Sequence, residues 1–239
     1  MKKICLILLS ALMLAGCAKD MSEDIRCIDD HWGEIAQGDA DEPILFLSET
    51  DYDNWVHMSD LDTRFLACRV PDGILKGKTT RALGLSILHY PLNYLLLYYN
   101  YYDLAVKQVY ERSPLHMTIA ARADAAPVLI DIFDQTSIDI NISTSVGYQS
   151  ITLQDEMFLE MFLGTRLVPG LDKGSNKEKI KAIVSRKMDE RKADSSFSTL
   201  SLIPLAYMNE RLGLGLKFDD DIVSTMHSFT LGDKLFEKQ

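Results

Sequence analysis

Large apolar and aromatic residues are concentrated between Cys68 and Phe133, where prolines divide them into short stretches. These prolines are Pro91, Pro114 and Pro127, and polar residues stand shortly before the last two. Proline fits the first turn of a helix, because its missing N–H group would have no partner there in any case. The pattern therefore predicts a set of short helices, each with a proline in or near its first turn.

Apolar residues elsewhere in the chain recur at steps of three and four, which is the spacing of one helix face. Thr152 with Asp155, and Ser175 with Glu178, resemble capping boxes, in which side chains satisfy the first free N–H groups of a helix. Together these signals predict helices over residues 22–36 and 59–70, and helices that begin near residues 152, 175 and 196.

The last predicted helix runs from residue 196 to residue 212, with a perturbation at Pro204 and an end at Gly213. Residues 137–148 are rich in β-branched and polar side chains, which indicates a short hairpin or a loop between two helical halves. The whole pattern predicts an all-α fold, either a multi-helix bundle or a short solenoid-like array of antiparallel helices. Any β structure would be a minor hairpin near 137–148.

The first seventeen residues read MKKICLILLSALMLAGC: two lysines, an apolar run, small residues and then a cysteine. This order is typical of an export signal, and the apolar run is too short to span a bilayer. The four residues that end at Cys17 resemble the lipobox of bacterial lipoprotein signal peptides. The resemblance implies cleavage before Cys17, lipid attachment to its thiol, and stable membrane anchorage through several acyl chains.

The residues after this cysteine, Ala18, Lys19 and Asp20 and then Glu23 and Asp24, resemble in part the export tag of Bacteroides-type surface lipoproteins. The resemblance implies an outer-membrane lipoprotein of the cell envelope, facing either the cell or the outside. The predicted division of the chain is a signal peptide (1–16), a lipidated acidic tether with the first helix (17–42), and a single helical domain (43–239).

The chain of 239 residues has a net charge of −10, and removal of residues 1–16 with Lys2 and Lys3 makes it −12. Nucleic-acid binding needs clustered Lys and Arg for phosphate contacts, so this composition argues against a nucleic-acid partner. Acidic residues are dense between Asp20 and Asp62. They indicate a solvated, repulsive surface that keeps an anchored domain extended from its membrane.

Two cysteines, Cys27 and Cys68, remain besides Cys17 once the signal peptide is removed. An exported compartment permits a disulfide between them, and that bond would close a long loop. Two buried thiols that behave as small hydrophobic side chains also fit the sequence. Both interpretations stay open at this point.

Five tyrosines are clustered in the middle of the apolar region. They are suited to line a groove for a sugar or a peptide, because tyrosine combines an apolar ring with a polar hydroxyl group. The other interpretation is a core cluster with its hydroxyl groups at the edge. The five residues are Tyr94, Tyr98, Tyr99, Tyr101 and Tyr102.

No motif for catalysis or cofactor binding is complete in this sequence. The stretch from Gly73 to Thr79 is one residue short of a P-loop, which needs four residues between its glycines to wrap a phosphate. His31 and Glu34 can supply half of a zinc site, and no third ligand is indicated. The sequence therefore predicts no catalytic residue, no cofactor and no metal.

Seventeen positions between Cys68 and Leu129 have a spacing that is similar to that of a known group of proteins. These positions are Cys68, Val70, Pro71, Leu75, Thr79, Thr80, Leu83, Tyr90, Pro91, Leu92, Asn100, Val109, Leu115, Arg122, Asp124, Ala125 and Leu129. They resemble a helical module of uncharacterised lipoproteins from Bacteroides-type bacteria. Residues 158–163 and 187–208 continue the similarity. The resemblance implies a helical fold and this lineage, and it carries over no activity and no site.

These observations favour a non-enzymatic binding or scaffold lipoprotein that uses a helical surface or the tyrosine groove. Its expected partners are the membrane, through the Cys17 lipid, and an envelope protein, peptide or glycan. The alternative is an envelope hydrolase or carbohydrate-active accessory protein with an acidic site that the sequence does not locate. A purely structural envelope protein is the third interpretation.

Overall fold

The computed structural model describes residues 38–44, 46, 55, 57–58, 60–136, 151–232 and 235–236. The chain divides into two compact units, Met1–Gly38 and Asp39–Gln239, and the helices described below all belong to the second. The sequence placed the start of the helical domain slightly later, at residue 43. Cys17, the predicted helix over 22–36 and the predicted hairpin or loop at 137–148 lie outside the described residues.

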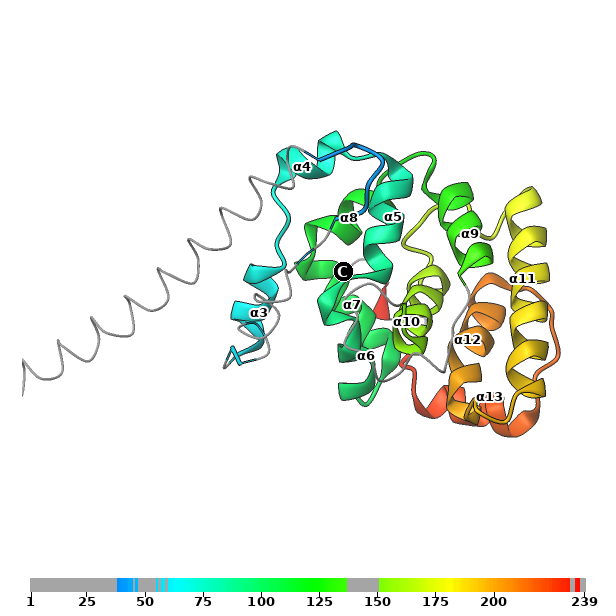
Figure 1. The fold of residues 1–239 in the computed structure, drawn as a ribbon. Helices are drawn as coiled ribbons and strands as arrows, with labels where there is room; N and C mark the ends of the chain where they lie inside the picture. Colours follow the sequence, from blue (N-terminus) through cyan, green and yellow to red (C-terminus); the bar gives the residue numbers. More distant parts are fainter. Residues whose placement is uncertain are drawn as a thin grey trace, which may run out of the picture. The chain divides into compact units, whose positions relative to one another are not determined.

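Regular structure in the described ranges is entirely helical, without a strand (Figure 1). This confirms the predicted all-α, multi-helix fold. Two short 3-10 helices, η1 (Pro91–Tyr94) and η3 (Thr199–Leu202), lead into α6 and α12. The α-helices are α3 (Leu61–Ala67), α4 (Asp72–Gly77), α5 (Thr80–Leu88), α6 (Leu95–Tyr98), α7 (Tyr102–Arg112), α8 (Pro114–Ala120), α9 (Ala125–Gln135), α10 (Leu153–Gly164), α11 (Gly174–Ala193), α12 (Ile203–Leu212) and α13 (Asp220–Ser228).

Helix α10 forms the centre of this unit. Every residue from Glu156 to Gly164 is buried, so neighbouring elements cover the helix on all sides. The helices around it include α5, α7, α9 and α12 (Figure 1). The contact with α12 is close, because a Cβ atom at Gly164 would lie only 2.6 Å from the ring of Tyr207. A glycine at this position therefore allows the two helices to approach.

Pro91, Pro114 and Pro127 lie in or near the first turn of a helix, as the sequence predicted. Pro91, Pro114 and Pro204 occupy the first turns of η1, α8 and α12. Pro127 is the third residue of α9. The single helix predicted over 196–212 is instead η3 followed by α12, which begins at Ile203, so Pro204 lies in a first turn and not inside a helix. Proline thus divides the apolar sequence into short helices that can change direction and pack around α10.

Of the two capping boxes that the sequence predicts, one is confirmed and the other is wrong. Thr152 and Asp155 form the predicted capping box, with Thr152 Oγ1 accepting from the Asp155 amide at 3.2 Å and Asp155 Oδ2 accepting from the Thr152 amide at 3.0 Å. The second predicted box, with Ser175 as its cap, is wrong. Helix α11 already begins at Gly174, with Lys173 in the capping position and no side-chain bond there. Ser175 lies inside the helix and cannot cap it.

The end of α12 also follows the sequence. Gly213 adopts the left-handed conformation, with a φ of 61°, and its amide donates to carbonyl groups of the last helical turn. A residue with a side chain is strained in this conformation, which is why glycine commonly ends helices.

Candidate functional site

Trp55, Tyr94 and Tyr98 form a continuous series of rings that leads from the interior to the solvent, and we call it the aromatic face. Tyr94 ends η1 and Tyr98 ends α6, four residues later, so both side chains lie on one side of this helical stretch. Their ring centroids are 5.3 Å apart, and those of Trp55 and Tyr94 are 5.9 Å apart. Both pairs meet edge to face, an arrangement that aromatic rings favour. Trp55 is buried, whereas Tyr98 is 78% exposed.

Arg64 on α3 fixes the orientation of these rings. Its Nη1 donates to the hydroxyl oxygen of Tyr94 at 2.9 Å, and its Nε and Nη2 donate to the carbonyl oxygen of Met58. The guanidinium carbon also lies 5.3 Å from the centroid of the Trp55 ring, which is close enough for a cation–π interaction. Arg64 therefore holds Tyr94 and Trp55 in place before any ligand arrives, and a preformed surface lowers the entropic cost of binding.

The structure brings two of the five predicted tyrosines into contact, namely Tyr94 and Tyr98. Tyr102 belongs to another contact, because it is buried and packs against Phe229 at a centroid distance of 5.2 Å. Tyr99 and Tyr101 lie on the connection between α6 and α7, where Tyr101 is 36% exposed. A groove lined by all five side chains stays a prediction.

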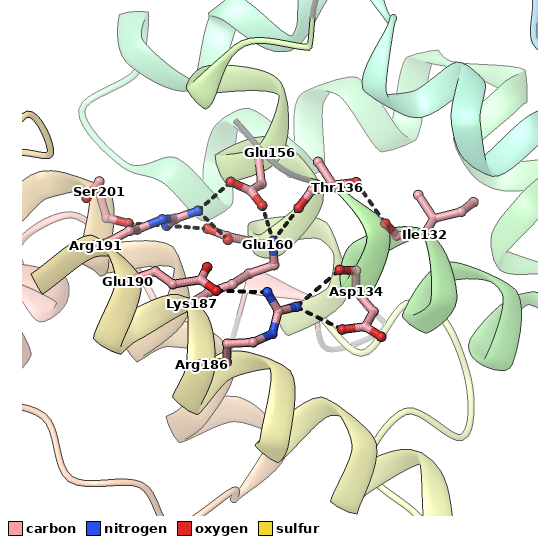
Figure 2. A network of polar contacts seen from close by, with 10 residues as sticks. All are labelled: Ile132, Asp134, Thr136, Glu156, Glu160, Arg186, Lys187, Glu190, Arg191 and Ser201. Atoms are coloured by element: carbon pink, nitrogen blue, oxygen red, sulfur yellow. Dashed lines mark hydrogen bonds and ion pairs between the residues drawn. The ribbon is translucent and has the colours of Figure 1, made fainter. Parts of the chain in front are cut away.

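A second cluster lies inside the molecule, where four charged side chains are buried between α10 and α11 (Figure 2). Glu156 and Glu160 come from α10, and Lys187 and Arg191 come from α11. Arg191 bonds both oxygens of Glu160, at 2.7 and 3.0 Å, and one oxygen of Glu156 at 2.8 Å. Lys187 bonds the other oxygen of Glu156. The four formal charges cancel.

The same two cations also bond backbone oxygens of neighbouring elements (Figure 2). Lys187 Nζ donates to the carbonyl oxygen of Thr136, just after α9, at 2.7 Å, and Arg191 donates to that of Ser201 in η3. At the edge of the cluster, Arg186 bonds Asp134 on α9 and Glu190 on its own helix. The network therefore joins α9, α10, α11 and η3.

Burial affects the protonation of Glu160 in this network. It raises the pKa of Glu160 to about 7, while Arg191 opposes the rise and the nearby Glu156 adds to it. Both oxygens of each carboxylate are occupied by cations. A buried group of this kind gives specificity and cohesion to a fold, and removal of one partner leaves an uncompensated charge. We therefore assign the network to the architecture and not to catalysis.

Sequence reasoning missed this network, although a signal was present. Lys187 and Arg191 continue the helical spacing of the buried residues Ile180, Ile183 and Val184 on α11. Two cations on the buried side of a helix require acids opposite them, because unpaired buried charges are very costly. The acids could not be identified in advance, since only the packing of α10 against α11 selects Glu156 and Glu160 from many.

Ser113 and His116 resemble a nucleophile and its base, with 2.8 Å between Ser113 Oγ and His116 Nδ1. Both are fully buried, however, and burial lowers the pKa of His116 to about 3. The imidazole is packed edge-on against Tyr90, Phe158 and Phe162, at centroid distances of 4.9, 5.6 and 5.6 Å. This environment keeps the ring neutral and makes the pair part of the core.

Cys68 is buried in the core, and burial raises the pKa of its thiol. A thiol in such a place is inert and packs as a small hydrophobic side chain. Its predicted disulfide partner, Cys27, lies outside the described residues, so the pairing of Cys27 with Cys68 stays a prediction.

The stretch that nearly matches a P-loop has ordinary structural contacts. Thr79 caps α5 by accepting from the Ala82 amide, and Lys78 Nζ donates to the carbonyl oxygen of Asp39. In the part of the chain that the structure describes, no group of three or more His, Cys, Asp or Glu side chains is placed to hold a metal ion. The described helices include none with the length and apolar character needed to cross a membrane.

Comparison with known proteins gives no further assignment, since no family model, curated protein or solved structure matches this chain.

Proposed function

We propose that this protein is a lipoprotein of the cell envelope that acts as a non-enzymatic binding or scaffold module. The anchor is the predicted lipid on Cys17, and the binding surface is the aromatic face. The observation that carries the proposal is the position of Tyr98, which is 78% exposed although its ring is held by Tyr94 and, through it, by Arg64.

Several apolar side chains near Tyr98 in sequence support this surface. Leu97, which precedes Tyr98 in α6, is 56% exposed, and Tyr101, on the connection to α7, is 36% exposed. Exposed aromatic and aliphatic side chains that lie close together commonly mark a binding surface, because their burial against a partner is favourable. An ordered ring such as Tyr98 supplies contact area with little loss of side-chain entropy.

The described acids and histidines give less support to an enzyme. The buried carboxylates of α10 are neutralised by Lys187 and Arg191, and His116 is enclosed by aromatic rings. The contrast with the solvent-facing Tyr98 favours binding over hydrolysis.

The proposal is tested by crosslinking the lipidated protein in its native envelope and by screening peptide and glycan libraries. We expect Tyr98→Ala to lower the recovery of the principal partner by about tenfold, which corresponds to about 1.4 kcal/mol. Leu200→Ala is the matched control, because Leu200 is also an exposed large apolar residue but lies on η3. Equal recovery with Tyr98→Ala, or library turnover without any stable partner, would contradict the proposal.

A further inference from the structure

Residues 229–232, which we call the C-terminal strap, follow α13 and lie against the beginning of α7. The amide of Tyr102 donates to the carbonyl oxygen of Phe229 at 2.8 Å. In return, Asp103 Oδ2 accepts from the amides of Leu231 and Gly232, at 2.8 and 3.0 Å. The backbone of the strap therefore both accepts a hydrogen bond from α7 and donates hydrogen bonds to it.

The side chain of Asp103 is central to the contact between α7 and the strap. Its side chain is fully buried, and burial raises its pKa, although backbone amides that bond the carboxylate oppose the rise. Oδ1 accepts from the Leu104 amide of its own helix, whereas Oδ2 is filled by the strap. A buried carboxylate needs such donors, because loss of water without replacement is costly. Without the strap, Oδ2 would need another pair of donors.

Most contacts of the strap involve its backbone. The amides of Leu231 and Gly232 converge on one oxygen, as consecutive amides do in anion-binding concavities of the backbone. Gly232 has a φ of 80°, which glycine adopts without strain. The Leu231 side chain is 47% exposed. Among the described residues, Phe229 contacts the ring of Tyr102. The beginning of α7 therefore contacts an aromatic ring and several backbone groups of the strap, which ends at a glycine with a positive φ.

The simplest explanation is that the strap caps α7. Tyr101, the capping residue of that helix, makes no side-chain bond there, so the carbonyl oxygen of Phe229 satisfies a free N–H group. Capping of α7 does not explain why the buried Asp103 accepts from two further amides of the strap. It also does not explain why the strap packs against a residue that is next to the exposed tyrosines in the chain. Tyr102, which packs against Phe229 of the strap, directly follows the exposed Tyr101 and lies four residues after Tyr98.

We propose that the beginning of α7 is a peptide-binding site that the C-terminal strap occupies as an intramolecular ligand. The external ligand is a short peptide with an aromatic residue followed three positions later by glycine, as in Phe229 and Gly232. Its binding displaces the strap and joins Tyr102 to the exposed tyrosines. This inference deepens the proposed binding function and rests on it, because it names peptide as the partner class.

The test uses the full chain and a fluorescent peptide with the sequence of residues 226–232. A tethered strap competes at a high effective concentration, so the unsubstituted protein should bind the peptide weakly. Phe229→Ala weakens the strap and leaves Tyr102 and Asp103 in place. We expect the peptide to bind this variant at least about tenfold more tightly, measured by fluorescence anisotropy. Leu231→Ala is the matched control and should bind like the unsubstituted protein.

Adding Asp103→Asn to Phe229→Ala should abolish the gain. Equal binding by Phe229→Ala and the unsubstituted protein, or a gain that survives Asp103→Asn, overturns the inference. If Phe229→Ala does not fold, hydrogen exchange of the unsubstituted protein decides. Excess peptide should accelerate exchange of the Leu231 and Gly232 amides, and unchanged rates overturn the inference. The proposed binding function is tested separately, by the effect of Tyr98→Ala on partner capture. It can therefore stand even if the peptide experiment overturns the inference about the strap.

Discussion

His116 shows how strongly the interior constrains a single side chain. The imidazole is fully buried among aromatic rings, and its only oxygen partner in the described part of the chain is Ser113 Oγ. Burial lowers its pKa from 6.5 to about 3, because the charged form would lose its hydration without gaining a counter-charge. In the unfolded chain the ring regains an ordinary pKa, so protons bind the unfolded state more tightly.

The stability of this protein should therefore fall as the pH decreases through the range between the unfolded and the folded pKa of His116, from 6.5 towards about 3. His116→Phe removes the titration and keeps a ring in the cage. Between about pH 7.5 and about pH 5, the unsubstituted protein should lose about 2 kcal/mol more unfolding free energy than the variant. Urea denaturation at both pH values measures this. Parallel losses in the two proteins would show that His116 is not buried as described.

At the scale of elements, α11 is attached in two different ways. Its first half presents Ile180, Ile183 and Val184 to the core, and its second half presents Lys187 and Arg191 to the acids of α10. Apolar contacts tolerate small shifts, whereas a hydrogen-bonded ion cluster demands one geometry. The network therefore selects one position for α11 among those that would bury its apolar residues.

Arg191→Met should destabilise the protein by about 3–5 kcal/mol, because Glu156 and Glu160 would lose their main partner and would have to stay charged without it or take up a proton. Arg186→Met is the matched control on the same helix. Arg186 also forms two ion pairs, but with exposed partners in water, so its loss should cost at most about 1 kcal/mol. Urea denaturation near neutral pH gives both values. Similar losses for the two variants would mean that the network is hydrated.

At the scale of the whole molecule, two features define the working protein that we propose. The first is a set of short helices packed around α10, which holds the aromatic face and the C-terminal strap in place. The second is the predicted lipid on Cys17, which would confine this domain to a membrane surface. Confinement raises the local concentration of an envelope partner and makes a modest affinity sufficient.

Cys17→Ser should abolish lipid attachment, because the thiol that accepts the diacylglyceryl group is absent. We expect metabolic labelling with a fatty-acid analogue to mark the unsubstituted protein and Cys5→Ser, whose change lies in the predicted signal peptide. The Cys17→Ser protein should carry no label. A labelled Cys17→Ser protein would refute the assignment of the anchor. Protease treatment of intact cells would then report separately whether the anchored protein faces outward.

Local features of the fold could be predicted from the sequence because their causes are local. Pro91, Pro114 and Pro204 fit only certain turns of a helix, and the Thr152 capping box acts within one turn. The cap predicted at Ser175 failed because α11 begins two residues earlier than predicted, with Lys173 in the capping position. Of the site, the sequence indicated Tyr94 and Tyr98 through their clustering. It did not indicate Arg64, which orders them from another helix.

The sequence alone determined the helical class, the helix starts marked by Pro91, Pro114 and the Thr152 cap, and the expectation of a lipid anchor, since each depends on neighbouring residues. Tertiary structure decided which charges are buried together, which tyrosine faces solvent and where the C-terminal strap binds. These contacts join residues far apart in the chain, such as Asp103 with Gly232 and Glu156 with Arg191. Their selection depends on how helices pack, and helical periodicity contains no information about which faces meet.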